Sequence, residues 1–298
     1  MDLEGFVQFA VNALSLGSLY ALMALGMAIV FGVLRLVNLA YGELIMVTGY
    51  TLFVLNDSAL PWLVIALVAV FMAAFASVLT ERIAFRPVRV NSLNAMLVTS
   101  FAVSTLLQNA ALLLVSPRTR AISIPSILSQ NLEVAGIRIA VSNLLAIVVS
   151  LALLVGLSLL LRRTTLGIAL RAAADDFPMT RMLGVRADRV IATAFAISGI
   201  LAGVVGLFWL ARIGSVIPTI GAAPLLIALI ATVIGGMQGL AGAIAGGYLL
   251  GALTVGMQLV LPQGLLDYRD AFIFIIVILV LLVRPQGLIA GRAAARVT

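Results

Sequence analysis

Glu43 combines a negative charge with a position inside a long apolar run. It ends the motif NLAYGE, residues 38–43, and the residues that follow are again mostly apolar. A charged side chain at the centre of a bilayer costs roughly 2.5 to 3.5 kcal/mol, so such acids usually face a bundle interior or a wet pathway. This pattern favours Asn38, Tyr41 and Glu43 as parts of a translocation path or gate. In the alternative, Glu43 lies near the end of its span and is solvated or paired with Arg35.

Composition excludes most catalytic and metal-binding chemistry. All 18 basic residues are arginine, and the sequence contains no lysine, histidine or cysteine. A Walker A lysine, a Schiff base, a histidine or thiolate metal site, a disulfide and a Ser-His or Cys-His nucleophile are therefore excluded. An intramembrane aspartyl enzyme would need two facing acids, but the aspartates at 175, 176, 267 and 270 fall in loops or at span ends. We expect no catalytic residues, no metal site and no cofactor.

The chain is too apolar for a soluble domain. It is 63% apolar and 10% charged, with a mean hydropathy of +1.25, whereas soluble domains are about half apolar and one quarter charged. Several runs approach or exceed the roughly 18 apolar residues that cross a bilayer as a helix. The net charge of +7 then reports membrane orientation, because its arginines cluster at the ends of apolar runs, and it does not indicate nucleic acid as a partner.

These runs predict an all-α polytopic membrane protein that forms a single domain over residues 1–298. About nine transmembrane helices are expected, with eight to ten possible and some short or broken at glycines. The expected spans are 6–34, 37–56, 61–80, 93–115, 139–161, 190–211, 224–236, 240–260 and 267–284. The segment 224–260 could instead be one span with a re-entrant piece. The long 116–138 loop is either an external cap or a connector.

Charge distribution orients these spans. With nine crossings and an outside N-terminus, 13 arginines lie inside and five outside, which is the sense of the positive-inside rule. We expect a multi-pass protein of the bacterial plasma membrane with its C-terminus in the cytoplasm. The acidic start lacks the basic region and cleavage site of a signal peptide, so the first run is expected to remain as a span.

Glycines predict where helices pack or break. The pairs 199/203, 242/246 and 247/251 have the small-xxx-small spacing of closely packed membrane helices. Gly235, Gly236 and Gly239 surround Gln238, and so many glycines should interrupt the helix. Broken helices at membrane depth survive only beside protein or water, so Gly235, Gly236 and Gln238 are expected to line a path or form a hinge. Polar residues inside other spans, such as Gln108, are expected to bond neighbouring helices.

Residues 162–189 form the longest polar segment, and they carry six arginines. Residues 166–176 predict a helical continuation, and Pro178 to Leu183 a second short helix that ends at Gly184. Asp188 is expected to cap the start of the next span. The two helices would present exposed Met179, Met182 and Leu183 between charges as a compact docking knob. An ordinary cytosolic loop held by arginines at the headgroups is the alternative.

Four motifs in order resemble the permease subunits of ABC importers for branched-chain amino acids, the type often called LivH, and the match runs nearly end to end. They are NALSLGSLYALMALG at 12–26, FGVLRLVNLAYGE at 31–43, RAAA at 171–174 with FAISGILAG at 195–203, and VRPQGL at 283–288. Tyr41 stands where such sequences commonly carry histidine, which weakens any proton chemistry there.

The resemblance implies a heteromeric, ATP-driven importer. A soluble binding protein would deliver branched-chain or related small amino acids or amides, and this chain would pair with a second homologous permease above two ATP-binding subunits that hydrolyse ATP. Its cytoplasmic coupling loop, 162–189, would touch those subunits, although the usual Glu-Ala-Ala signature is not literal here. The coupling residues implied are Arg171, Ala172, Ala173, Asp175, Met179, Arg181, Leu183 and Gly184.

Two other hypotheses come from different classes. An ion-coupled secondary transporter of small polar solutes could use Glu43 and broken helices, and it would transport without an ATPase. An intramembrane enzyme has almost no suitable residues. The absence of lysine agrees with the importer, because nucleotide energy must then come from another polypeptide.

Overall fold

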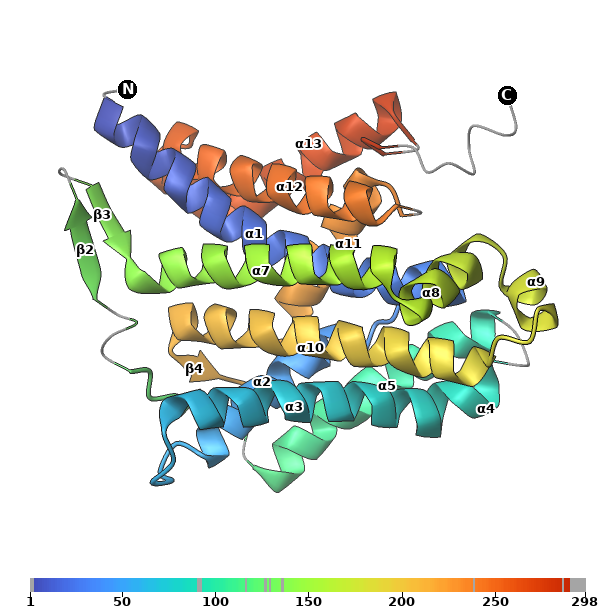
Figure 1. The fold of residues 1–298 in the computed structure, drawn as a ribbon. Coiled ribbons are helices and arrows are strands. Elements are labelled where there is room, and N and C mark those ends of the chain that lie inside the picture. The colour runs from blue at the N-terminus through green and yellow to red at the C-terminus, as the bar shows by residue number, and fades with distance from the viewer. Residues whose placement is uncertain are drawn as a thin grey trace. The chain divides into compact units, whose positions relative to one another are not determined.

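In the computed structural model of the chain, the described residues are mostly helical (Figure 1). The structure describes residues 3–89, 93–115, 117–125, 128, 130–134, 137–237, 239–285 and 287–289. The helices are α1 (Leu3–Leu34), α2 (Tyr41–Val54), α3 (Trp62–Thr80), α4 (Arg86–Val88), α5 (Leu93–Leu114), α7 (Val141–Arg163), α8 (Thr165–Asp175), α9 (Phe177–Met182), α10 (Ala187–Ile213), α11 (Ala222–Gly235), α12 (Leu240–Val260) and α13 (Arg269–Val283). A π-helical turn, Glu81–Phe85, joins α3 to α4, and a 3-10 turn, Gln263–Tyr268, precedes α13.

Six helical segments of the described ranges are long and apolar enough to cross a membrane: α1, α3 with its continuation to Val88, α5, α7, α10 and α12. Helices α2 and α11 have 14 residues each and α13 has 15, so they rise only about 21 to 23 Å, short of the ~30 Å hydrocarbon core. The expected all-α polytopic membrane class is confirmed. Nine full crossings are not confirmed, because three of the nine expected spans form short helices.

The chain divides into two compact units. The first contains 1–25, 125–154 and 227–298, and the second contains 26–124 and 155–226. Helices α1, α7 and α11 each contribute residues to both units.

In the second unit, α3 and α10 lie side by side (Figure 1) because glycines remove the side-chain bulk between them. A Cβ at Gly199 would lie 2.7 Å from the Cα of Ala74, and one at Gly203 would lie 2.9 Å from the Cα of Val70. Helix α2 packs on α10 in the same way, since a Cβ at Gly206 would lie 2.9 Å from the Cβ of Thr48. The predicted close packing at 199/203 is confirmed.

In the first unit, α12 packs through its glycines on two sides. A Cβ at Gly246 would collide with the backbone of α11, and Cβ atoms at Gly247 and Gly251 would collide with the backbone of α1. Thr232 of α11 donates a 3.1 Å hydrogen bond to the carbonyl of Ala24. The predicted pair of helices within 224–260 is confirmed by α11 and α12.

Short strands add to the helical fold outside the expected spans. In the second unit, β1 (Arg120–Ala121) pairs antiparallel with β4 (Ser215–Val216), and the backbone N–H of Ser123 donates to Asn56 Oδ1 at 2.9 Å. In the first unit, β2 (Asn131–Val134) and β3 (Ile137–Ala140) form an antiparallel pair. The first part of the long loop is thus tied to the residues that follow α2 and α10.

Candidate functional site

Two capped helices build the predicted docking knob in the second unit. Thr164 precedes α8 and accepts a 3.0 Å hydrogen bond from the Gly167 N–H, and Asp176 precedes α9 and accepts a 2.9 Å bond from the Met179 N–H. Gly184 follows α9 with φ of +82°, a left-handed conformation that favours glycine. The predicted second helix and its glycine end are confirmed, with the helix starting one residue earlier, at Phe177.

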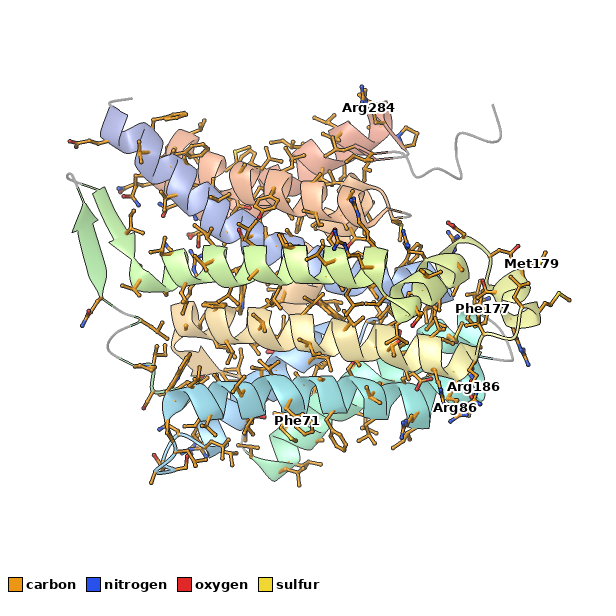
Figure 2. The ribbon with its side chains drawn as sticks, in the orientation of Figure 1. Phe71, Arg86, Phe177, Met179, Arg186 and Arg284 are labelled. Atoms are coloured by element: carbon orange, nitrogen blue, oxygen red, sulfur yellow. The ribbon has the colours of Figure 1, made fainter. Side chains whose placement is uncertain are left out.

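The tip of this knob is apolar and exposed. Met179 is 54% exposed, Met182 84% and Leu183 76%, and Figure 2 labels Met179 on the outer side of α9. Such side chains gathered on a short helix are typical of a protein contact. Of the expected coupling residues, Arg171, Asp175, Arg181 and Gly184 are also exposed, whereas Ala172 is half-buried and Ala173 is buried. Ala173 therefore packs inside the unit.

Arg35 joins this knob to the segment that follows α1. Its guanidinium Nη2 donates a 2.7 Å hydrogen bond to the carbonyl oxygen of Ala174, one of the last residues of α8. Carbonyls in the last turn of a helix have no partner within that helix, so an arginine there satisfies an otherwise unpaired acceptor. Among the described residues, Arg35 is the one non-glycine with positive φ, at +55°. Its side chain is thus held in place despite backbone strain.

Glu43 is buried, with 1% exposure, and Ser104 and Gln108 of α5 bind it. Its Oε1 accepts a 2.9 Å hydrogen bond from the Ser104 hydroxyl and a 2.7 Å bond from the Gln108 amide. The expectation that a polar residue such as Gln108 bonds a neighbouring helix is confirmed. The alternative in which Glu43 pairs with Arg35 is wrong, because the Arg35 side chain reaches Ala174 instead.

Asn38 and Tyr41 shape the non-helical link between α1 and α2. The Asn38 Oδ1 accepts a 3.1 Å hydrogen bond from the Ala40 N–H, and the Asn38 carbonyl accepts a 3.2 Å bond from the Tyr41 N–H. Both side chains are buried, at 4% and 1% exposure. Tyr41 fits against α1 only because position 26 is glycine, since a Cβ there would lie 2.5 Å from the tyrosine oxygen. The path-or-gate residues Asn38, Tyr41 and Glu43 are therefore all buried, within one short stretch of the chain.

Gly235 and Gly236 form a separate, tightly held turn in the first unit. Gly236 has φ of +105°, and both residues are buried. The Leu288 N–H donates a 2.8 Å hydrogen bond to the carbonyl of Ile234, and the Ile289 N–H donates a 3.3 Å bond to that of Gly235. The segment after α13 thus binds the last carbonyls of α11. Gln238, the third residue expected here, lies outside the described residues.

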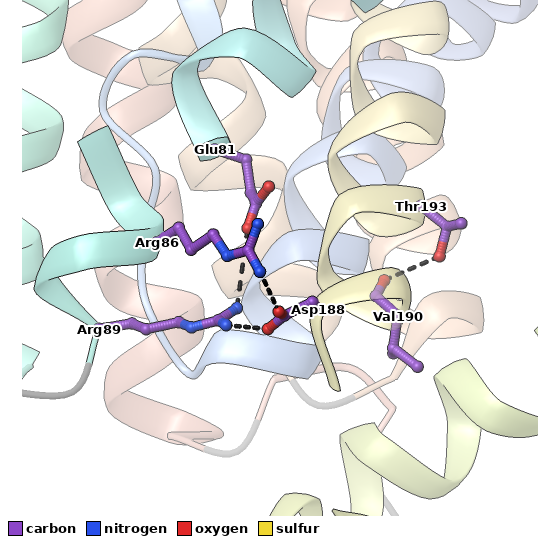
Figure 3. A network of polar contacts seen from close by, with 6 residues as sticks. All are labelled: Glu81, Arg86, Arg89, Asp188, Val190 and Thr193. Carbon is purple, nitrogen blue, oxygen red and sulfur yellow. Dashed lines mark hydrogen bonds and ion pairs between the residues drawn. The ribbon is translucent and has the colours of Figure 1, made fainter. Parts of the chain in front are cut away.

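Asp188 does not cap α10, so that expectation is wrong. The residue before α10 is Arg186, which makes no capping bond, and Asp188 lies inside the first turn. Its carboxylate instead binds the guanidinium groups of Arg86 and Arg89, and Arg89 also lies 3.7 Å from Glu81 (Figure 3). These interactions tie the start of α10 to the end of the α3–α4 helix.

Two of these contacts could not be found by sequence spacing. The Arg35–Ala174 and Asp188–Arg86 bonds join residues 139 and 102 positions apart. The only sequence signal was the prediction that these arginines share one side of the membrane. The ranges that the structure describes contain no cluster of His, Cys, Asp or Glu suited to a metal ion.

The long apolar helices define a polytopic membrane protein, to which the polar link before α2 and the exposed knob are added. The chain belongs to the family described as branched-chain amino acid transport system / permease component, whose model matches residues 9–281. The predicted family is therefore confirmed.

Full-length relatives agree. The chain is 33% identical to the high-affinity branched-chain amino acid transport system permease protein BraD of Pseudomonas aeruginosa, over 98% of this chain and 97% of that protein. It is 31% identical to the LivH permease protein of Escherichia coli K12, over 96% of each chain. No solved structure matches the chain. These relatives are transport permeases and not enzymes, and they favour the importer over the ion-coupled alternative.

Proposed function

We propose that this chain is a membrane-spanning permease subunit of an ATP-driven importer for branched-chain or related small amino acids or amides. Its partners are a soluble substrate-binding protein, two ATP-binding subunits and a second, homologous permease. The full-length similarity to BraD and LivH supports this function. The absence of lysine supports separate ATP-binding subunits, because a standard phosphate-binding loop needs one.

The hydrogen bond from Arg35 to Ala174 carries the mechanistic part of the proposal. It joins the end of α8, in the knob where an ATP-binding subunit would dock, to the link that contains Asn38 and leads into Tyr41 and Glu43 of α2. A displacement of the knob would therefore act on this link and, through it, on the start of α2. We assign the exposed residues of 165–184 to the docking surface, and Ala172 and Ala173 to the support of that surface.

A second route runs through α10. The ion pairs of Asp188 fix the start of α10 to the α3–α4 helix, and the glycine contacts at 199 and 203 fix their bodies. Interfaces packed this closely move as rigid bodies, because they cannot deform continuously. Helix α2 follows α10 through the Gly206–Thr48 contact. Movement of the knob would thus tilt α2, α3 and α10 together, which would open the path to alternate sides.

Asn38, Tyr41 and Glu43 fit the gate role better than the path-lining role. All three are buried, and Glu43 binds α5 directly. Release of the Ser104 and Gln108 bonds would let the start of α2 separate from α5. Gly235, Gly236 and the neighbouring Gln238 would serve as a hinge, since the surrounding backbone contacts leave the two glycines little access to a solute.

Arginine distribution supports the sidedness of the proposal. Arg35, Arg89, Arg181, Arg186 and Arg189 line one cleft in the second unit, and we place this end in the cytoplasm by the positive-inside rule. Since α1 ends there, its N-terminus lies outside. The C-terminus lies inside if the short helices complete nine crossings. We place the subunit in the bacterial plasma membrane, with the whole chain acting as one permease domain because α1, α7 and α11 contribute to both units.

Reconstitution tests the proposal. The chain alone in proteoliposomes should neither hydrolyse ATP nor take up leucine, whereas the complex with its second permease, ATP-binding subunits and binding protein should do both. Deletion of residues 171–184 should abolish uptake while membrane insertion is retained. Uptake by the chain alone under an ion gradient would contradict the proposal.

A further inference from the structure

An open cleft of about 970 Å³ lies in the second unit beside the docking knob. Its walls come from the end of α1, the residues around the start of α5, helix α9 and the first turns of α10. Five arginines and one acid line it, namely Arg35, Arg89, Arg181, Arg186, Arg189 and Asp188. Figure 2 labels Arg186 and Phe177, two of the lining residues, at this end of the unit. The cleft is therefore strongly basic.

Most of this positive charge has no counter-charge within the unit. Asp188 and Glu81 balance Arg86 and Arg89 in the network of Figure 3. Arg35 donates to a neutral carbonyl. Within the described ranges, no ion pair includes Arg181, Arg186 or Arg189, and all three are exposed. Four arginines thus remain available to an anion.

The other wall of the cleft is apolar. Val33, Leu34, Leu93, Met96 and Ile191 line it, and each lies in the first or last turns of a helix long enough to cross the membrane. The cleft is therefore at the depth where acyl chains meet headgroups. A ligand that satisfies both walls carries a negative headgroup on an apolar tail. A basic pocket between transmembrane helices is a common form of phospholipid site.

We propose that this cleft binds the phosphate headgroup of an anionic phospholipid. Free phosphate shares the anionic chemistry but leaves the apolar wall uncovered. Acidic side chains of an ATP-binding subunit are a weaker fit, because the exposed tip residues Met179, Met182 and Leu183 are not among the described residues that line the cleft. The tip residues thus lie outside the cleft, and of the described exposed residues in 165–184 only Arg181 lines it. A headgroup bound to Arg181, Arg186 and Arg189 would also brace the knob against α1 and α5.

Lipid retention by the assembled transporter tests this site independently of transport. The purified complex is exchanged into micelles that contain phosphatidylglycerol or phosphatidylcholine, and retained lipids are counted by native mass spectrometry. The double variant Arg186→Gln/Arg189→Gln should retain phosphatidylglycerol about 10- to 30-fold more weakly, since each arginine near anionic lipid contributes roughly one factor of five. The matched control Arg162→Gln/Arg163→Gln removes two exposed arginines from the end of α7 outside the cleft and should stay within about threefold of the native chain.

The remaining arms separate the sources of the anion. Phosphatidylcholine should not be retained, and inorganic phosphate at millimolar concentration should not displace phosphatidylglycerol. Arg186→Lys/Arg189→Lys should keep most of the retention, because it keeps the charge, and so exclude misfolding of the Gln variant as the cause. Equal losses in the cleft variant and its control would overturn the proposal. So would binding of phosphate without lipid, or retention only in the chain without its ATP-binding subunits.

Discussion

Replacement of Arg35 by glycine should separate coupling from stability. The residue holds a left-handed backbone, φ +55°, in which a non-glycine residue costs about 1 to 2 kcal/mol. The hydrogen bond from its guanidinium to the Ala174 carbonyl stabilises the fold by a similar amount, about 1.5 kcal/mol, because the donor is charged but exposed. Arg35→Gly removes both terms, so the unfolding free energy should change by less than about 1 kcal/mol. Arg35→Gln removes only the bond and should destabilise by about 1 to 2 kcal/mol.

Transport should respond differently from stability. Both variants lose the joint between the docking knob and the α1–α2 link, so uptake per ATP hydrolysed should fall about 5- to 30-fold, the factor that corresponds to 1 to 2 kcal/mol. The assay measures ATP hydrolysis and leucine uptake on the same proteoliposomes, and thermal unfolding of the complex in detergent. Arg212→Gln is the matched control, since it removes an exposed arginine from the opposite end of α10. The reasoning is refuted if Arg35→Gly keeps full uptake per ATP, or if it melts as early as Arg35→Gln.

Substitutions at three further sites test the helix packing, the buried acid Glu43 and the ion pairs of Asp188. Gly199→Leu should destabilise the complex by at least about 2 kcal/mol, because the new Cβ would collide with the backbone of α3. The control Gly156→Leu should leave the melting temperature nearly unchanged, because a Cβ at position 156 meets nothing within 4 Å. Glu43→Gln should keep uptake within about threefold of the native chain, since an amide oxygen can accept both hydrogen bonds. Glu43→Ala, which removes the acceptor, should lower the unfolding free energy by about 1 to 3 kcal/mol. Complete loss of uptake in Glu43→Gln would show that the charge itself is required. Asp188→Asn should lower the melting temperature in low salt and lower it much less in high salt, because salt screens the partly exposed ion pairs of Asp188. An equal decrease at both salt concentrations would contradict an electrostatic role.

Local patterns predicted the helices and their close contacts. Small-xxx-small spacing identified the faces of α10 and α12 because glycine pairs act wherever two helix backbones approach. Pro178 and Gly184 bounded α9 because both restrict the backbone locally. The position of Glu43 in an apolar run correctly predicted that its side chain faces the interior of the helix bundle. Its partners Ser104 and Gln108 could not be named, since their position depends on the rotation of α5.

Long-range contacts and helix lengths were beyond these patterns. Asp188 was expected as a cap because aspartate at a helix start usually caps, but Arg86 at the start of α4 and Arg89 directly after α4 bind the same carboxylate. No local pattern indicated the role of Arg35, because the carbonyl that its side chain binds lies far along the chain, in α8. Hydropathy also cannot tell a full span from a short helix such as α2, whose preceding link is partly buried but not helical.

Cysteine labelling of the knob is the most direct test of the claim that an ATP-binding subunit docks on it. The native chain has no cysteine, so Met182→Cys, at a side chain that is 84% exposed, provides one reactive group on the knob. A second variant, Asp57→Cys, places one just after the end of α2, where the account expects the outer side of the membrane. A membrane-impermeant maleimide should label position 182 only from the cytoplasmic side, at least tenfold more slowly once the ATP-binding subunits are present, and position 57 only from outside. Labelling of position 182 from outside, or an unchanged rate on assembly, would contradict the account.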